Sequence, residues 1–188
     1  MAGLVVRRQG RGTYVEGRVP QQRFRGCLGD LIRESSRAKT RNVELSHNAP
    51  IPSQIAEALA LDSPRGTIVR RTRTMDGRPF AYTTAYPPPD LGRKVTVAGL
   101  RRTALMELLL DSGVVLSSAT QTVRAQLADL DVRAQIDAEL GAPVLFVERI
   151  AHDISGRPVE YVRCWYRGTG TNTPSPSTWR RARTGTRT

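Results

Sequence analysis

The sequence predicts an α+β protein in which helices flank one antiparallel β-sheet. In residues 64–86 and again in residues 143–165, β-branched and aromatic residues flank a Gly-Arg-Pro turn, which is the pattern of a β-hairpin. Each residue of the second copy lies 79 positions after its counterpart, and six identities keep this register: Pro143, Arg149, Gly156, Arg157, Pro158 and Tyr161. A short run with helical spacing precedes each copy. The sequence therefore predicts a duplicated helix–hairpin unit whose copies form two halves of one sheet.

Local signals predict the remaining elements. Strands are expected at 40–45 and 114–127, and helices at 24–38, 53–61 and 104–110, with one more helix before the second hairpin. His47 and Asn48 are expected in an exposed loop after the first of these strands. Side chains that favour helix starts predict three N-caps, at Ser53, Thr103 and Asp131.

Composition restricts the classes of partner and cofactor. The formal net charge is +12, and arginine carries nearly all of it because Lys39 and Lys94 are the only lysines. Such a balance indicates a polyanionic partner such as nucleic acid, although an arginine-rich coding bias would produce the same charge. The two cysteines and two histidines lack metal-ligand spacing, so no metal or cofactor is expected. The absence of a signal-peptide pattern and of a membrane-spanning run predicts a cytoplasmic protein.

The two ends of the chain differ from its middle. Residues 169–188 are rich in Thr, Ser, Pro, Gly and Arg and predict a disordered basic tail. Residues 4–15 predict a small hairpin with arginines near a glycine-rich turn. Such a hairpin can bring its backbone and guanidinium groups close to DNA phosphates, or it can be an edge hairpin with a solvated basic tip.

The N-terminal hairpin closely resembles the wing of the winged helix-turn-helix in GntR-type bacterial transcriptional regulators, where a Gly-x-Gly-Thr-aromatic-Val run closes the DNA-binding domain. The resemblance implies DNA contacts by the residues at and beside the turn, namely Arg8, Gln9, Gly10, Arg11, Gly12 and Thr13. In that family the recognition helix precedes the wing, whereas this sequence begins at the wing. The missing recognition helix predicts weak DNA binding, if any, by this polypeptide alone, and it suggests a truncated gene product.

The rest of the chain is similar to the effector-sensing UTRA domain of the HutC subfamily of those regulators. The resemblance divides the chain into a remnant wing at 1–16, a linker at 17–23, a UTRA domain at 24–168 and the basic tail at 169–188. It implies a chorismate-lyase-like fold, a homodimer, and a small anionic metabolite, a sugar phosphate or another organic acid, that modulates DNA binding.

The resemblance also implies an effector site, carried over position by position to Arg71, Arg73, Thr103, Glu160 and Tyr166. The two arginines lie two residues apart, on one face of a strand, and planar guanidinium groups suit a carboxylate or phosphate. Thr83 stands where amino-sugar-sensing members carry glutamate, so an amino-sugar phosphate is not expected.

Two alternatives remain beside the regulator. A lyase on the same fold would place the two arginines and Glu160 around an aromatic acid, and a dimerisation module would bind no ligand at all. No spacing in the sequence demands catalysis, because neither His47 nor His152 lies beside a nucleophile or a paired carboxylate. No catalytic residue is therefore predicted.

Overall fold

The computed structural model describes residues 6–8, 12–14, 39–75 and 77–168. At the N-terminus, strands β1 (Val6–Arg8) and β2 (Gly12–Tyr14) pair antiparallel, which confirms the predicted hairpin. Its turn, with Gln9, Gly10 and Arg11, lies outside the described residues, as do the predicted helix at 24–38 and the predicted tail. Within the described part of the chain, no helix is long and apolar enough to cross a membrane.

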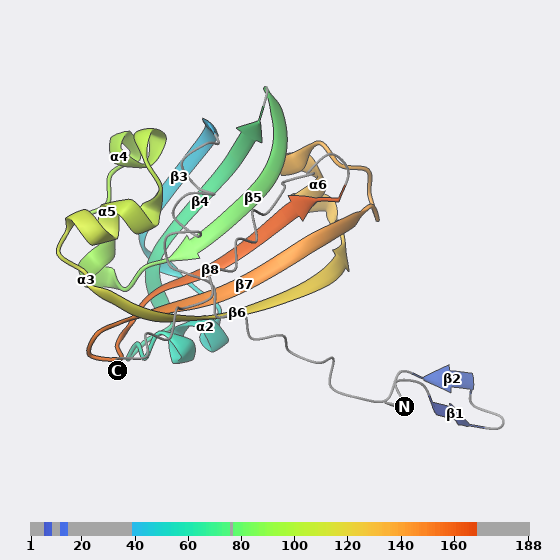
Figure 1. Cartoon of the computed structure of the whole chain (residues 1–188), viewed down its shortest axis with the longest axis horizontal. Coiled ribbons are helices and arrows are strands. Elements are labelled where there is room, and N and C mark those ends of the chain that lie inside the picture. Colours follow the sequence, from blue (N-terminus) through green and yellow to red (C-terminus); the bar gives the residue numbers. More distant parts are fainter. Residues whose placement is uncertain (1–5, 9–11, 15–38, 76, 169–188) are drawn as a thin grey trace, which may run out of the picture.

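The main body is one antiparallel six-stranded sheet with the strand order β3-β4-β5-β8-β7-β6 (Figure 1). The strands are β3 (Lys39–Pro50), β4 (Arg65–Met75), β5 (Arg78–Tyr86), β6 (Leu116–Leu127), β7 (Pro143–Asp153) and β8 (Pro158–Arg167). The helices are α2 (Ser53–Ala58), α3 (Pro89–Gly92), α4 (Val97–Arg102), α5 (Leu105–Asp111) and α6 (Leu130–Ile136). The predicted α+β class and the flanking helices are confirmed.

The sheet consists of two copies of one strand–helix–hairpin unit. The first copy is β3-α2-β4-β5, the second is β6-α6-β7-β8, and they join in the middle of the sheet where β5 pairs with β8. Both hairpin turns carry a glycine in the left-handed region, Gly77 at φ 78° and Gly156 at φ 81°, which favours glycine over other residues. The predicted duplication is therefore confirmed, and α3, α4 and α5 form an insertion between the copies.

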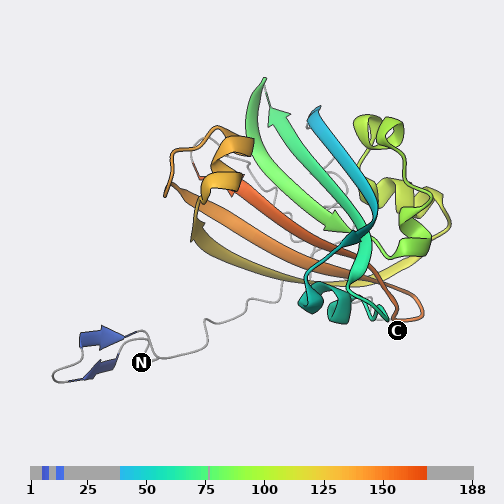
Figure 2. The same ribbon diagram turned by 180° about the vertical axis from the view of Figure 1, so that it is seen from behind.

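The two faces of the sheet carry separate cores. On the α4–α5 face, strand residues such as Val69, Ala81 and Cys164 pack against Leu100 and other residues of the inserted helices. On the α2–α6 face, α2 lies near one end of the strands and α6 near the other (Figure 2), and they bury Ile55 and Ile136 in separate clusters. Because successive strand residues point to opposite faces, this arrangement decides which polar side chains can meet.

Several predicted boundaries were wrong. The strand predicted at 40–45 continues to Pro50, so His47 and Asn48 lie in β3 and not in a loop, although His47 is exposed as expected. The pairing of β3 with β4 shifts between Ser46 and Ala49, and Asn48, at φ 51°, accepts a 2.9 Å hydrogen bond on Oδ1 from Arg65 Nε. An edge strand tolerates such a bulge because no further strand needs its register.

The three predicted N-caps were also wrong by one or two positions. Pro52 precedes α2 and Ser53 is its first residue, and α2 ends at Ala58 rather than Leu61. The α6 cap is Asp129, whose Oδ1 accepts a 2.8 Å hydrogen bond from Val132 N–H, and Asp131 lies within the first turn. At α6 the shift has a simple cause, because Asp129 and Asp131 satisfy the same composition rule.

Candidate functional site

Arg71 and Arg73 lie on β4 and point to the α4–α5 face, as the two-residue spacing predicts. They pair with Thr83 and Ala81 of β5, whereas Thr72 between them donates a 2.7 Å hydrogen bond to Gln135 of α6 on the opposite face. Arg73 is 8% exposed and Arg71 is half-buried. The structure therefore holds two guanidinium groups close together on a covered face.

Arg71 connects the sheet to the junction between α4 and α5. Its Nη1 donates to the carbonyl oxygens of Thr103, at 3.0 Å, and of Leu100, at 3.4 Å. Burial lowers the pKa of Arg71, and the like charge on Arg73 lowers it further, while Glu160 acts in the opposite direction. Burial and the charge of Arg73 thus disfavour the charged form of Arg71, which a bound anion would stabilise.

Arg73 and Tyr166 lie on either side of Phe80. The guanidinium carbon of Arg73 is 5.4 Å from the centre of the Phe80 ring, and the Phe80 and Tyr166 ring centres are 6.3 Å apart. Phe80 is the extra residue where the pairing of β4 with β5 shifts, so it lies on the same side as Arg73. This bulge therefore builds an aromatic wall beside the arginine pair.

Glu160 is buried and ion-paired within the chain. Its Oε2 lies 3.2 Å from Nη2 of Arg149 on β7, and the two side chains are 3% and 18% exposed. Arg149 Nε is a buried donor that has no hydrogen-bond partner among the described residues. The charge of Glu160 also acts on the pKa of Arg71. Its partner Arg149 is therefore a third arginine on this face.

Cys164 lies in the middle of this group. It pairs with Thr83 across β5–β8, and its Sγ is 3.2 Å from Thr83 Oγ1. Burial raises the pKa of the Cys164 thiol, while hydrogen bonds with Thr83 and Tyr166, and then the charges of Arg73 and Arg149, act against the rise. Cys164 is a free buried thiol, and it marks the point between Arg73 and Arg149.

Thr103 lies beside Arg71 but does not begin the predicted helix. It is the C-cap that follows α4, and α5 begins at Leu105 after Ala104. The N-cap of α5 is Ala104, and the Glu107 carboxylate accepts a 3.3 Å hydrogen bond from Ala104 N–H. The backbone carbonyl of Thr103, held by Arg71, is what ties this residue to the site.

Arg149 is the residue that sequence reasoning missed. In the 79-residue register it corresponds to Arg70, which points to the α2–α6 face and pairs with Glu44. The second hairpin turn is one residue longer, however, since Met75 pairs with Arg78 but Asp153 N–H donates to the Arg157 carbonyl. The register of β7 therefore shifts by one residue, which moves Arg149 to the α4–α5 face.

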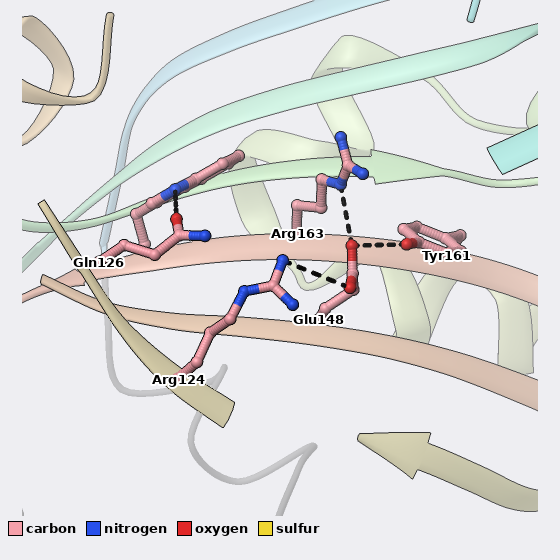
Figure 3. A network of polar contacts seen from close by, with 6 residues as sticks. Arg124, Gln126, Glu148, Tyr161 and Arg163 are labelled. Atoms are coloured by element: carbon pink, nitrogen blue, oxygen red, sulfur yellow. Dashed lines mark hydrogen bonds and ion pairs between the residues drawn. The ribbon is translucent and has the colours of Figure 1, made fainter. Parts of the chain in front are cut away.

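The α2–α6 face carries a polar network of its own (Figure 3). Glu148 accepts hydrogen bonds on Oε1 from the Tyr161 hydroxyl, at 2.6 Å, and from Arg163 Nε, at 3.1 Å. Its other oxygen lies 3.8 Å from Arg124 Nη2, and Trp165 Nε1 donates to Gln126 at 3.3 Å. Each of these groups has a partner within the chain, so the network stabilises the sheet without calling for a ligand.

Comparison with known proteins identifies the fold. The family model described as UTRA domain matches residues 34–171. The chain belongs to the UTRA domain family. An HTH-type transcriptional regulator of Mycobacterium tuberculosis is 37% identical over 168 residues, covering 85% of this chain and 61% of the relative. One of Rhizobium meliloti is 30% identical over 175 residues, covering 86% of this chain and 68% of the relative. The chain thus spans about two thirds of the length of these relatives.

Solved structures give the same result. The ligand-binding domain of a protein described as a GntR-family transcriptional regulator from Bordetella bronchiseptica has a TM-score of 0.64 and 26% identity, over 72% of this chain and 85% of that one. A protein from Streptomyces coelicolor described as a transcriptional regulator has a TM-score of 0.61 and 31% identity, over 70% of this chain and 89% of that one. The predicted resemblance to GntR-type regulators is confirmed, and the match is to their effector-binding domains.

Proposed function

We propose that this chain is the effector-sensing part of a metabolite-responsive, DNA-binding transcriptional regulator. A small anionic metabolite binds on the α4–α5 face, at Arg71, Arg73, Thr103, Glu160 and Tyr166. The observation that carries the proposal is the arginine pair on one covered face, in which Arg73 is 8% exposed and the half-buried Arg71 donates to the carbonyls of Thr103 and Leu100. Two guanidinium groups that the fold holds together at a cost form a binding site prepared for a carboxylate or phosphate.

The position of Arg71 connects the site to the rest of the molecule. Its hydrogen bonds to the carbonyls of Leu100 and Thr103 join β4 to the junction of α4 and α5. A ligand that draws the guanidinium toward itself competes with these two bonds and so shifts the junction. A displacement of the inserted helices is the physical means by which the ligand would alter DNA binding in a homodimer.

DNA binding and location belong to the same proposal. The basic N-terminal hairpin contributes phosphate contacts. The relatives' names as regulators favour a cytoplasmic binding protein over an enzyme. A lyase acting on an aromatic acid is the alternative that a measured turnover would support, and a dimerisation module is the alternative without any ligand.

A thermal-shift screen against phosphorylated sugars and organic acids tests the proposal. A ligand at 100 times its dissociation constant adds about 2.7 kcal/mol of stability. Arg73→Met should abolish the shift, because it removes a guanidinium from the site while preserving an apolar stem. The matched control is Arg70→Met, three residues away on the same strand but on the opposite face, which should leave the shift intact.

Three results would contradict the proposal. They are the absence of any stabilising anion, an equal loss in the Arg70→Met control, or a ligand shift that survives Arg73→Met. The wild type must be shown to fold before the first of these is accepted, for which a cooperative melting curve suffices.

A further inference from the structure

The two copies of the repeated unit place an arginine at equivalent positions on the α4–α5 face. Arg71 pairs with Thr83 on β5, and Arg149 pairs with Val162 on β8. Thr83 and Val162 correspond in the repeat, because β5 and β8 keep the 79-residue register. Arg71 and Arg149 are therefore structural counterparts, one on each side of the central β5–β8 pair.

The contacts of Arg149 leave a donor for a further group. Nη2 is used by Glu160, and Nε is buried without a hydrogen-bond partner in the described part of the chain. An unpaired buried N–H raises the free energy of the ligand-free state. That cost disappears if the guanidinium turns toward an acidic group while its Nη2 stays with Glu160.

Cys164 lies between these arginines. Both Arg73 and Arg149 act electrostatically on the Cys164 thiol, from β4 on one side and β7 on the other. Arg71, Arg73 and Arg149 supply three positive charges against Glu160, and the group stays cationic if the more distant Glu107 is counted. Charge is thus distributed at two ends of the site and is not concentrated at one.

We propose that Arg149 binds the ligand directly and that the ligand carries two separate acidic groups. Arg71 and Arg73 hold one group, Arg149 holds the other, and the middle of the ligand spans the distance between β4 and β7. This inference rests on the proposed function, and it narrows the ligand to a dicarboxylate or a phosphorylated carboxylic acid. A sugar phosphate with a single acidic group would leave Arg149 unused.

Calorimetric titration of the full chain tests the inference with defined probes. Succinate, glutarate and 3-phosphoglycerate carry two acidic groups, and succinamate and glutaramate replace one carboxylate of the first two by a neutral amide. At least one of the acids with two acidic groups should bind. If that acid is succinate or glutarate, its monoamide should bind at least about tenfold more weakly. The comparison keeps chain length and shape nearly constant, so it isolates the second charge.

The variant Arg149→Lys removes the Nε donor but keeps a cation beside Glu160. It should weaken binding of the acid with two acidic groups about tenfold, leave the binding of the monoamide unchanged, and preserve the melting temperature of the free chain. Arg163→Lys on the opposite face is the matched control and should not alter affinity. If Arg149→Lys does not fold, the pair Arg149→Gln with Glu160→Gln removes both charges together and should abolish the preference for two acidic groups.

The outcomes separate the two proposals. Equal affinity for an acid with two acidic groups and its monoamide, or wild-type affinity in Arg149→Lys, overturns the role of Arg149 while leaving the anion site in place. If a phosphorylated sugar with one acidic group binds and no acid with two acidic groups does, the role of Arg149 is likewise overturned and the anion site remains. Failure of every anion to bind overturns the proposed function as well.

Discussion

Replacing Glu148 by alanine removes the acceptor at the centre of the network on the α2–α6 face. The carboxylate is one-fifth exposed and accepts from the Tyr161 hydroxyl at 2.6 Å and from Arg163 Nε at 3.1 Å. Hydrogen bonds to a charged group contribute about 1.5–3 kcal/mol each, and the 3.8 Å contact with Arg124 at most about 1 kcal/mol. Because water can reach the partly exposed guanidinium groups after the change, we expect about half of this sum, roughly 1.5–3.5 kcal/mol.

Urea denaturation at neutral pH measures this loss directly. Glu44→Ala is the matched control, because Glu44 also pairs with an arginine on the same face, at 3.4 Å, but its side chain is 66% exposed. That variant should cost less than about 0.5 kcal/mol. The reasoning is refuted if Glu148→Ala costs no more than Glu44→Ala. A loss of ligand affinity in Glu148→Ala would contradict the separate claim that this face has no part in ligand binding.

Three further predictions concern stability. Burial, and then the hydrogen bond to the network carboxylate, raise the pKa of Tyr161 to about 12 from 10.0, so the folded chain favours the neutral phenol. The stabilisation is complete below pH 10 and is lost as the pH rises toward 12. We expect about 1 kcal/mol after allowing for solvent screening, and Tyr161→Phe should flatten the fall in denaturation curves across this range. Leu100→Ala and Ile55→Ala each truncate a fully buried side chain and should cost about 2–5 kcal/mol, but only Leu100→Ala, whose carbonyl Arg71 holds, should also weaken the ligand in calorimetry. Asp129→Ala should lower the free energy of unfolding by about 1 kcal/mol because it removes the α6 cap, whereas Asp131→Ala should cost only a few tenths, and a reversed order would support the cap predicted from the sequence.

The repeated hairpins were predictable because strand patterns are local. β-branched and aromatic runs around Gly77 and Gly156 determine both turns, and the constant spacing of the copies predicts one sheet. The shared face of Arg71 and Arg73 follows from the two-residue period of a strand. These features need no knowledge of what packs against them.

The other features of the fold and of the site depend on packing between distant segments, which no local sequence pattern predicts. Arg149 could not be placed correctly, because one extra residue in the second turn reverses the face of every residue on β7 relative to the repeat. The short helices α3 and α4 lack the length that gives a clear apolar period. The tether from Arg71 to the carbonyls of Leu100 and Thr103 joins residues about thirty positions apart and appears only when the insertion folds back on the sheet.

The central claim is that an anion binds between the arginines of the α4–α5 face. Its most direct test follows the arginine side-chain N–H signals by nuclear magnetic resonance while the acid with the largest thermal shift is added. Single Arg→Lys variants assign the signals. The account predicts that Arg71, Arg73 and Arg149 shift together and saturate at one dissociation constant, while Arg70 and Arg163 stay in place. Saturable shifts at Arg70 and Arg163 without shifts at the first three would place the ligand on the opposite face and contradict the account.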